Sequence, residues 1–278
     1  MNSIWFLGDV HAEFEHIYRA IEAAAVRPVA VVFLGDIESP MPFDAVIGRI
    51  ESYGVRAYWI IGNHDTDSES NYRHLQSPLA QARRIDGRVV EIAGQRIGGV
   101  GGIFRGEIWR PIASSKGRVA PPNYDSYSDY ATALRQKQGI QRRLSKLDVV
   151  RAQATPRHIR NLVDETKNGK LRKHQSSIFP DTVAQLATLK ADVLVSHEAP
   201  GCHPHGFAEI DVLARTMGVK TAIHGHHHDH LDYSMFEAAM GFRTYGVGLC
   251  GITDQSGKVI VPGALDHHRG YRELRFEQ

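Results

Sequence analysis

Cysteine is scarce in this chain, and long apolar runs are missing from it. Cys202 and Cys250 are the only cysteines among its 278 residues, and neither belongs to a C-x-x-C pair. Because two cysteines cannot build a disulfide framework, we expect reducing surroundings and no metal site made of thiolates. No apolar run approaches the roughly 20 residues that a membrane-spanning helix needs. We therefore expect a protein without a membrane partner.

A secretory leader is also missing. No basic residue precedes the first apolar run, Ile4–Leu7, which is too short for the apolar region of a signal peptide and leads directly towards Asp9. We expect the chain to begin at Met1 and to remain in the cytoplasm. With 42% hydrophobic and 23% charged residues, the composition is typical of a globular protein with a sizeable core. We interpret residues 1–278 as a single domain.

Several short apolar segments are each followed closely by aspartate, asparagine or histidine. The segments are rich in β-branched and aromatic residues, which predicts buried strands. In open α/β sheets, ligands bind in the crevice outside the carboxyl ends of the strands. Because packing alone hardly explains so many repetitions, we expect a functional site where these strands end. The five arrangements are Ile4–Leu7 before Asp9 and His11, Val29–Leu34 before Asp36, Val55–Ile61 before Asn63, His64 and Asp65, Val193–Val195 before His197 and Glu198, and Thr221–Ile223 before His224–His228.

Amphipathic patterns separate the first three of these segments and predict helices, one of them over Glu13–Ala25. Such alternation implies parallel strands with right-handed crossovers. The segments Val89–Ala93 and Arg96–Phe104 are strand-like, and we interpret them as an antiparallel continuation of the same sheet. Residues 107–130, which contain three prolines and three tyrosines, are expected to form a long loop.

Residues 131–175 have helical periodicity and an unusual charge. They contain twelve Lys/Arg and three Asp/Glu, a formal charge of +9, so the remainder of the chain carries −7. The segment is either a pair of helices with solvated basic faces or a cap that attracts a polyanion, and nucleic acid is one such partner. The tyrosines at 124, 127 and 130 either pack under this cap or stack on a nucleobase.

The strand-end residues have the chemistry of metal ligands. Carboxylate, amide and imidazole groups suit divalent Mn, Fe, Zn, Ni or Co, and seven of them exceed what one ion needs. In an extended segment residues i and i+2 point to one side, so we expect each Asp-x-His or His-x-His pair to face one site. Two ions together can clamp the attacking and leaving oxygens of an in-line displacement. The candidate ligands are Asp9, His11, Asp36, Asn63, His197, His226 and His228.

In their order and spacing, these motifs resemble the five motifs of the calcineurin-like metallophosphoesterases. The resemblance covers residues 1–105 and 181–262 and omits the insertion at 107–178. It implies an α+β fold, a four-layer αββα sandwich of two mixed β-sheets flanked by helices, with a dinuclear metal centre at the strand ends. The motifs are Gly8–His11, Gly35–Asp36, Gly62–Asp65, Ser196–Pro200 and Gly225–His228.

The resemblance also implies a role for each residue. His64 would face the substrate and stabilise the transition state or protonate the leaving oxygen, Asp65 would orient its ring, and a metal-bridging hydroxide would attack. The second motif lacks the Asp-Arg-Gly extension of the protein serine/threonine phosphatases, so the phosphate contact must come from elsewhere, and Arg73 and Arg105 are candidates. The implied ligand sets are Asp9, His11, Asp36 and His228 for one ion, and Asp36, Asn63, His197 and His226 for the other.

Four functions are compatible with these observations. The first is hydrolysis of a phosphate mono- or diester by a dinuclear metal centre. The second is a nuclease or other phosphodiesterase that grips DNA or RNA with residues 131–175, for which affinity would fall steeply with salt. The third is activity like that of a serine/threonine protein phosphatase. The fourth is a scaffold without catalysis, against which the complete set of candidate ligands argues.

Overall fold

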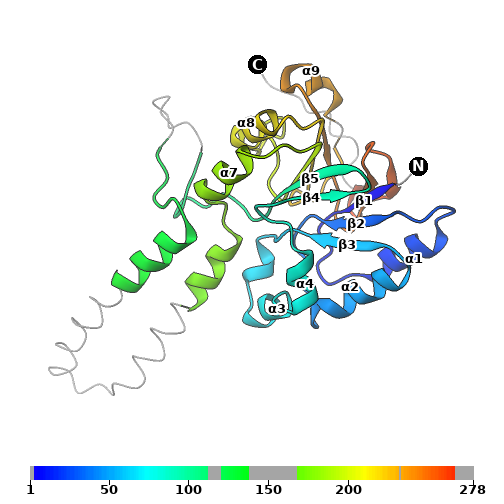
Figure 1. Cartoon of the computed structure of the whole chain (residues 1–278), viewed down its shortest axis with the longest axis horizontal. Helices are drawn as coiled ribbons and strands as arrows, with labels where there is room; N and C mark the ends of the chain where they lie inside the picture. Colours follow the sequence, from blue (N-terminus) through cyan, green and yellow to red (C-terminus); the bar gives the residue numbers. More distant parts are fainter. Residues whose placement is uncertain (1–2, 112–119, 138–167, 232, 267–278) are drawn as a thin grey trace.

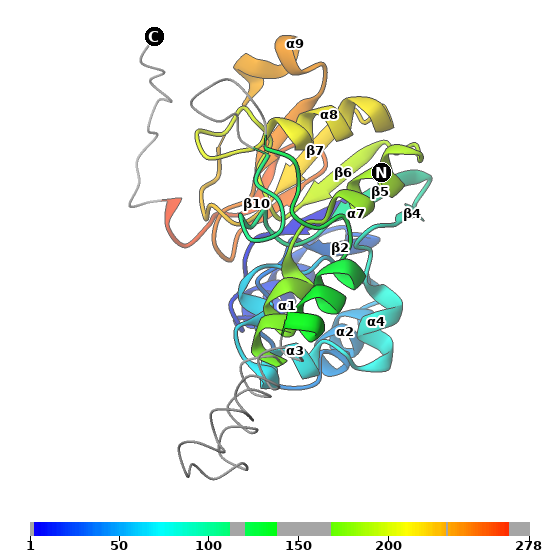
Figure 2. The same cartoon turned by 90° about the vertical axis from the view of Figure 1, so that its left-hand side faces the viewer.

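The computed structural model describes residues 3–111, 120–137, 168–231 and 233–266. Two five-stranded mixed sheets pack face to face, and Figures 1 and 2 show helices α1–α4 on one side of the pair and α7 and α8 on the opposite side. This confirms the expected α+β sandwich of four layers.

Sheet A has the strand order β10-β9-β1-β2-β3. Its central part is parallel, and β9 and β10 add two antiparallel strands at one edge. All residues of β1 and β2 are buried, as expected for strands covered on both faces. The strands are β1 (Ile4–Leu7), β2 (Ala30–Phe33), β3 (Arg56–Trp59), β9 (Ile252–Asp254) and β10 (Val259–Val261).

Sheet B has the strand order β4-β5-β6-β7-β8, with β4 antiparallel to β5 and the other pairs parallel. The expected continuation of the first sheet by β4 and β5 is therefore wrong, because this hairpin begins the second sheet. Alternating apolar residues predict a strand but do not distinguish edge pairing from face-to-face stacking. The strands are β4 (Val89–Ile92), β5 (Gln95–Val100), β6 (Val193–Ser196), β7 (Thr221–His224) and β8 (Arg243–Gly246).

The helices cover the outer faces of the two sheets. Ile17, Ile47 and Ile50 bury the apolar faces of α1 and α2 against sheet A, and Leu186 and Leu213 do the same for α7 and α8 against sheet B. The α-helices are α1 (Glu15–Ala23), α2 (Phe43–Ser52), α3 (Glu69–His74), α4 (Pro78–Arg83), α7 (Pro180–Ala187), α8 (Ala208–Met217) and α9 (Glu237–Met240), and the 3-10 helices are η1 (His64–Thr66), η2 (His174–Ser176) and η3 (Ser234–Phe236).

A third core lies between the sheets and fixes their relative position. Phe6 and Val32 of sheet A pack in the same buried cluster as Ile97, Val195 and Ile223 of sheet B. Because side chains at alternate positions of each strand enter this layer, the ends of β1, β2 and β3 are held beside the ends of β6 and β7.

The described ends of the insertion are helical at residues 127–137 and 168–173. The long loop expected over 107–130 is therefore shorter than predicted, because a helix begins at residue 127. Tyr124 and Tyr130 make an edge-on contact, with ring centroids 5.2 Å apart, and Tyr130 is buried beside Phe179. The tyrosines thus pack within the protein. Residues 138–167, the centre of the basic segment, lie outside the described residues.

Candidate metal centre

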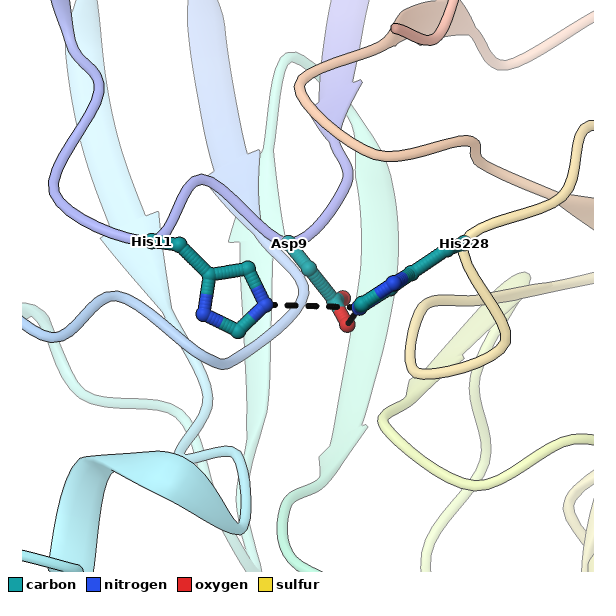
Figure 3. Close-up of side chains that lie close together, drawn as sticks. All are labelled: Asp9, His11 and His228. Atoms are coloured by element: carbon teal, nitrogen blue, oxygen red, sulfur yellow. Dashed lines mark hydrogen bonds and ion pairs between the residues drawn. The ribbon is translucent and has the colours of Figure 1, made fainter. Parts of the chain in front are cut away.

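Asp9, His11 and His228 form the first group of possible metal ligands. Asp9 and His11 follow β1, whereas His228 follows β7 of the other sheet (Figure 3). His228 Nε2 lies 3.0 Å from Asp9 Oδ2 and 3.3 Å from His11 Nε2. One ligand atom from each residue lies within 4.8 Å of the others, close enough to share one ion.

Glu38 supports this group from outside. Its Oε2 lies 2.6 Å from His11 Nδ1, which leaves His11 Nε2 facing the group. A carboxylate on the far nitrogen of an imidazole fixes the tautomer and orients the ring of metal-binding histidines. The sequence does not indicate a role for Glu38, because its contact with His11 joins two motifs 27 residues apart.

Asp36, His197 and His226 form a second group of the same size. His197 is fully buried, and its Nδ1 donates a hydrogen bond of 2.7 Å to the Leu34 carbonyl. That bond turns Nε2 of His197 towards Asp36 Oδ2 at 3.4 Å and Asn63 Oδ1 at 3.1 Å. All seven candidate ligands are thus brought to neighbouring strand ends.

The backbone of the candidate ligands is strained. Four of them have positive φ: His11 (41°), Asp36 (48°), His226 (69°) and His228 (60°). Non-glycine residues rarely adopt this region, and such strain concentrates at functional sites. The extended conformation that the His-x-His spacing suggests is not present at His226 and His228. They adopt left-handed turn conformations, and each joins a different group.

Two motif glycines allow the close approach of the strand ends. A Cβ at Gly35 would lie 2.4 Å from His197 Nδ1, and a Cβ at Gly62 would lie 2.1 Å from the Asp36 amide nitrogen. Neither position has room for a side chain, so the glycines before Asp36 and Asn63 let the two loops pack against each other.

The electrostatics of the second group favour positive charge. Burial by itself raises the pKa of Asp36, but His197 and the His64 amide lower it below its usual value. Burial lowers the pKa of His197, but Asp36 and then Asp9 raise it to about 10. Burial and His197 lower the pKa of His226 to about 4, so this imidazole is neutral and its lone pair is available.

The donor atoms fit a metal ion. Within the described ranges, Asp9 Oδ2 and Asp36 Oδ2 are buried and have no hydrogen-bond partner. Each lies near an imidazole Nε2, so a positive charge, either a proton on the imidazole or a metal ion, is needed between the two atoms. Carboxylate, amide and imidazole donors without sulfur suit borderline divalent ions.

His64 lies beside the first group, at the surface. Its ring centroid is 5.6 Å from that of His11, and about half of its side chain is exposed. His64 Nδ1 donates to Asp67 Oδ2 over 2.6 Å. Although burial lowers the pKa of His64, the bond to Asp67 and the charge of Asp36 raise it above its usual value. The Nε2 atom is therefore the one that can contact a substrate.

The structure does not support the expected role of Asp65 in orienting His64. The Asp65 carboxylate is fully buried and accepts backbone N–H bonds from Ile37, Glu38 and Gly62, at 2.7, 2.8 and 2.8 Å. It therefore ties the second motif to the third. Asp67 contacts the His64 ring instead, because the 3-10 turn at residues 64–66 brings residue i+3 beside residue i.

Arg105 and Arg73 differ sharply in their surroundings. Arg105 is partly buried, its Nη1 donates to the Ser176 carbonyl over 2.7 Å, and burial lowers its pKa despite Asp67 and Asp36 nearby. Arg73 is exposed and pairs with Glu69 at 3.8 Å. Of the two expected phosphate contacts, Arg105 lies nearer to the candidate metal ligands.

Buried histidines surround the second group. His203 is 6% exposed and stacks on His227 with ring centroids 3.7 Å apart. His224 is buried and lies 3.1 Å from the Tyr233 hydroxyl. Glu198, also buried, forms a third group with His226 and His227. Packing of the loops after β6 and β7 produces this cluster, which spacing does not reveal.

The described part of the insertion gives no support to a nucleic-acid grip. Arg172, one of the twelve basic residues at 131–175, binds the turn at residues 66–69 instead of projecting into solvent. Arg142 and Arg143, two further basic residues of the segment 131–175, lie outside the described residues. None of the helices in the part of the chain that the structure describes has the length and apolar character to span a bilayer.

Comparisons with known proteins identify relatives of this chain. The model of a family described as calcineurin-like phosphoesterase matches residues 3–230. An uncharacterized protein of Haemophilus influenzae is 31% identical over 266 residues, which cover 96% of this chain and all of that protein. Protein TT1561 of Thermus thermophilus has a solved structure with a TM-score of 0.45 and 12% identity, covering 92% of this chain and 96% of that one. A second solved chain gives a TM-score of 0.46 at 13% identity, with 93% and 97% covered.

Proposed function

The chain belongs to the calcineurin-like phosphoesterase family, and we propose that it hydrolyses phosphate esters with a pair of divalent metal ions. The observation that carries this proposal is the convergence of two ligand groups at the ends of both sheets, with His64 exposed beside them. One ligand set is Asp9, His11, Asp36 and His228, and the other is Asp36, Asn63, His197 and His226, so that Asp36 is shared.

The metal ions supply, when bound, positive charge at the phosphoryl group and a source of hydroxide near neutral pH. The chain itself orients these groups. Glu38 and the Leu34 carbonyl fix the rings of His11 and His197, and Asp67 fixes the ring of His64. These bonds hold the imidazoles before a substrate arrives, so little reorganisation accompanies the reaction.

His64 acts on the leaving oxygen in this proposal. Because Asp67 holds Nδ1, the proton at Nε2 of the imidazolium is the one that His64 can donate. Exposure of the side chain leaves room for an ester beside it. Arg105 is the proposed contact for a phosphate oxygen, supported by its position near Asp36 and Asp67.

A panel of esters tests the proposal. Protein purified with Mn²⁺ is assayed with p-nitrophenyl phosphate, bis(p-nitrophenyl) phosphate, phosphorylated metabolites, a phosphopeptide and an oligonucleotide. We expect hydrolysis that EDTA abolishes and Mn²⁺ restores, and the preferred ester separates monoesterase from diesterase. Protein that contains less than about one ion per chain under these conditions, and that cleaves no ester, contradicts the proposal.

A further inference from the structure

The insertion returns to the core beside the turn that carries His64. We name residues 168–177 the return arm and residues 62–69 the His64 turn. The return arm comprises the helical residues 168–173 and the 3-10 helix η2, which contacts η1 of the His64 turn. About a hundred residues of sequence separate the two segments, so the sequence alone does not indicate that they are in contact.

Arg172 makes the most specific contacts between these segments. Its Nε donates to the Thr66 carbonyl over 3.0 Å, its Nη2 to the Asp67 carbonyl over 3.2 Å, and its Nη1 to Glu69 Oε2 over 2.8 Å. Only 19% of its side chain is exposed, although the guanidinium is charged. The planar fork of arginine can hold three acceptors at once, which a lysine ammonium on a flexible stem does not reproduce.

A second contact joins the same segments through buried hydroxyls. Thr66 Oγ1 lies 2.7 Å from Ser176 Oγ, and both residues are almost completely buried. Arg105 Nη1 donates to the carbonyl oxygen of Ser176 over 2.7 Å. The return arm is therefore fixed to the core independently of Arg172, and loss of Arg172 should not detach it.

The contact of Arg172 with Asp67 leads directly to His64. Arg172 holds the main chain of Asp67, and the side chain of Asp67 holds His64 Nδ1 over 2.6 Å. His64 and Asp67 are both largely exposed, with 47% and 60% of their side chains accessible, so the neighbouring protein restrains them little. A fixed main chain at Asp67 thus limits where the imidazole can point.

We propose that Arg172 is a positioning residue, through which the return arm of the insertion sets the orientation of the Asp67–His64 pair for the reaction. This inference rests on the proposed function, because it assigns His64 a role in ester cleavage. The insertion then contributes to catalysis by orienting His64, apart from any contact that it makes with the substrate. A displacement of about 1 Å at a reacting group can cost on the order of 10²-fold in rate.

A double-mutant cycle between Arg172→Ala and His64→Ala tests this role, with p-nitrophenyl phosphate or the best ester of the panel. We expect Arg172→Ala to lower kcat by about 10- to 100-fold, with KM and metal content nearly unchanged. In the His64→Ala background the same substitution should change kcat by less than about twofold, since residues that act through one another are not additive. Lys170→Ala removes an exposed charge from the same arm and should have no effect.

The outcomes separate this inference from the function on which it rests. Suppose that His64→Ala still hydrolyses the ester slowly and that Arg172→Ala lowers kcat by the same factor in both backgrounds. That result overturns the positioning role and leaves the proposed function standing. An Arg172→Ala variant with unchanged kcat also overturns it. Wild-type protein without hydrolysis overturns the function and this inference together. Arg172→Lys, which retains the charge and most of the stem, provides a folded variant if alanine does not, and we expect it to recover only part of the rate.

A measurement without turnover provides a second readout. The proton on His64 Nδ1 should give a downfield NMR signal, assigned by its loss in His64→Ala, because it is shared with the Asp67 carboxylate. We expect Arg172→Ala to weaken or shift this signal and Lys170→Ala to leave it in place. An unchanged signal in Arg172→Ala contradicts the inference.

Discussion

The two sheets deliver different chemistry to the same place. The strands of sheet A end in both carboxylates and the amide of the candidate ligand set, together with His11, whereas those of sheet B contribute only imidazoles to that set. The first and second groups of possible ligands each take members from both sheets, whereas the third, Glu198, His226 and His227, comes from sheet B alone. In the first two groups, sheet A thus supplies both carboxylates and sheet B three of the four imidazoles, and neither sheet alone provides either set.

The surroundings of the candidate ligands also differ between the strand ends of sheet A and those of sheet B. Beyond its ligands, sheet A places His64 and Asp67 at the surface, where a substrate can reach them. Sheet B buries further histidines, His203 and His224, around its ligands. We infer that the end of sheet A faces the substrate, while the end of sheet B forms a rigid support for the second metal position.

Loss of the shared carboxylate should have the largest effect. Asp36→Asn keeps the shape of the side chain but removes the charge that both ligand sets use, so we expect hydrolysis to fall by more than about 10⁴-fold and metal content to fall below one ion per chain. Steady-state assays and elemental analysis measure both. Asp192→Asn, at a partly exposed carboxylate beside sheet B that pairs with Arg96, serves as the control and should retain both properties. Retention of two ions by Asp36→Asn contradicts the shared role.

Removal of His64 should separate catalysis from metal binding at the end of sheet A. We expect His64→Ala to retain its metal and to lose about 10²- to 10⁴-fold in kcat, because a proton donor is lost while the ligands stay. The loss should be smaller for p-nitrophenyl phosphate than for an alkyl phosphate, whose leaving oxygen needs the proton more. Equal losses for the two esters argue against proton donation.

Removal of the metal should weaken the junction between the sheets. Ions that bind only the folded chain stabilise it by about 2.7 kcal/mol at a hundredfold excess over Kd, which corresponds to a shift of Tm on the order of 5–10 °C in a chain of this size. Thermal unfolding with EDTA and with Mn²⁺ measures the shift. The Asp36→Asn variant should show only a small shift of Tm. A shift as large as that of the wild-type protein means that Mn²⁺ stabilises the chain at another site.

The buried histidines behind sheet B should produce the smallest effect, a loss of stability in acid. Burial and then His205 lower the pKa of His203 to about 4 despite Asp229, whereas an unfolded histidine titrates near pH 6.5. The unfolded chain therefore binds more protons between these values, and stability present above pH 6.5 is lost as the pH falls towards 4. His203→Phe should reduce this loss by up to about 2 kcal/mol at pH 5 in metal-free protein, as chemical denaturation measures. His205→Phe, at an exposed site, is the matched control and should leave most of this loss in place, because burial is the larger cause of the shift in His203. Identical slopes for both variants contradict the prediction.

The sequence predicts those parts of the centre that are encoded locally. Short apolar strands followed by polar residues predict where ligands lie, and periodicity predicts the helix expected over Glu13–Ala25, which the structure shows as α1 at Glu15–Ala23. The family resemblance predicts a second sheet, whereas the alternation of apolar residues alone assigns β4 and β5 to the wrong sheet.

Contacts between distant segments were not predictable in this way. The Glu38–His11 and Arg172–Asp67 bonds join residues that only the folded chain brings together. The exchange of roles between Asp65 and Asp67 depends on a 3-10 turn of three residues, which spacing does not indicate. Residue type predicted the chemistry of the site, and tertiary packing decided which neighbour orients each group.

Anomalous diffraction from crystals grown with Mn²⁺ tests the central claim most directly. Two ions held at the junction of the sheets should give two peaks, one between Asp9, His11 and His228 and one between Asn63, His197 and His226, with Asp36 touching both. A single peak, or peaks away from these residues, contradicts a paired metal centre built from both sheets.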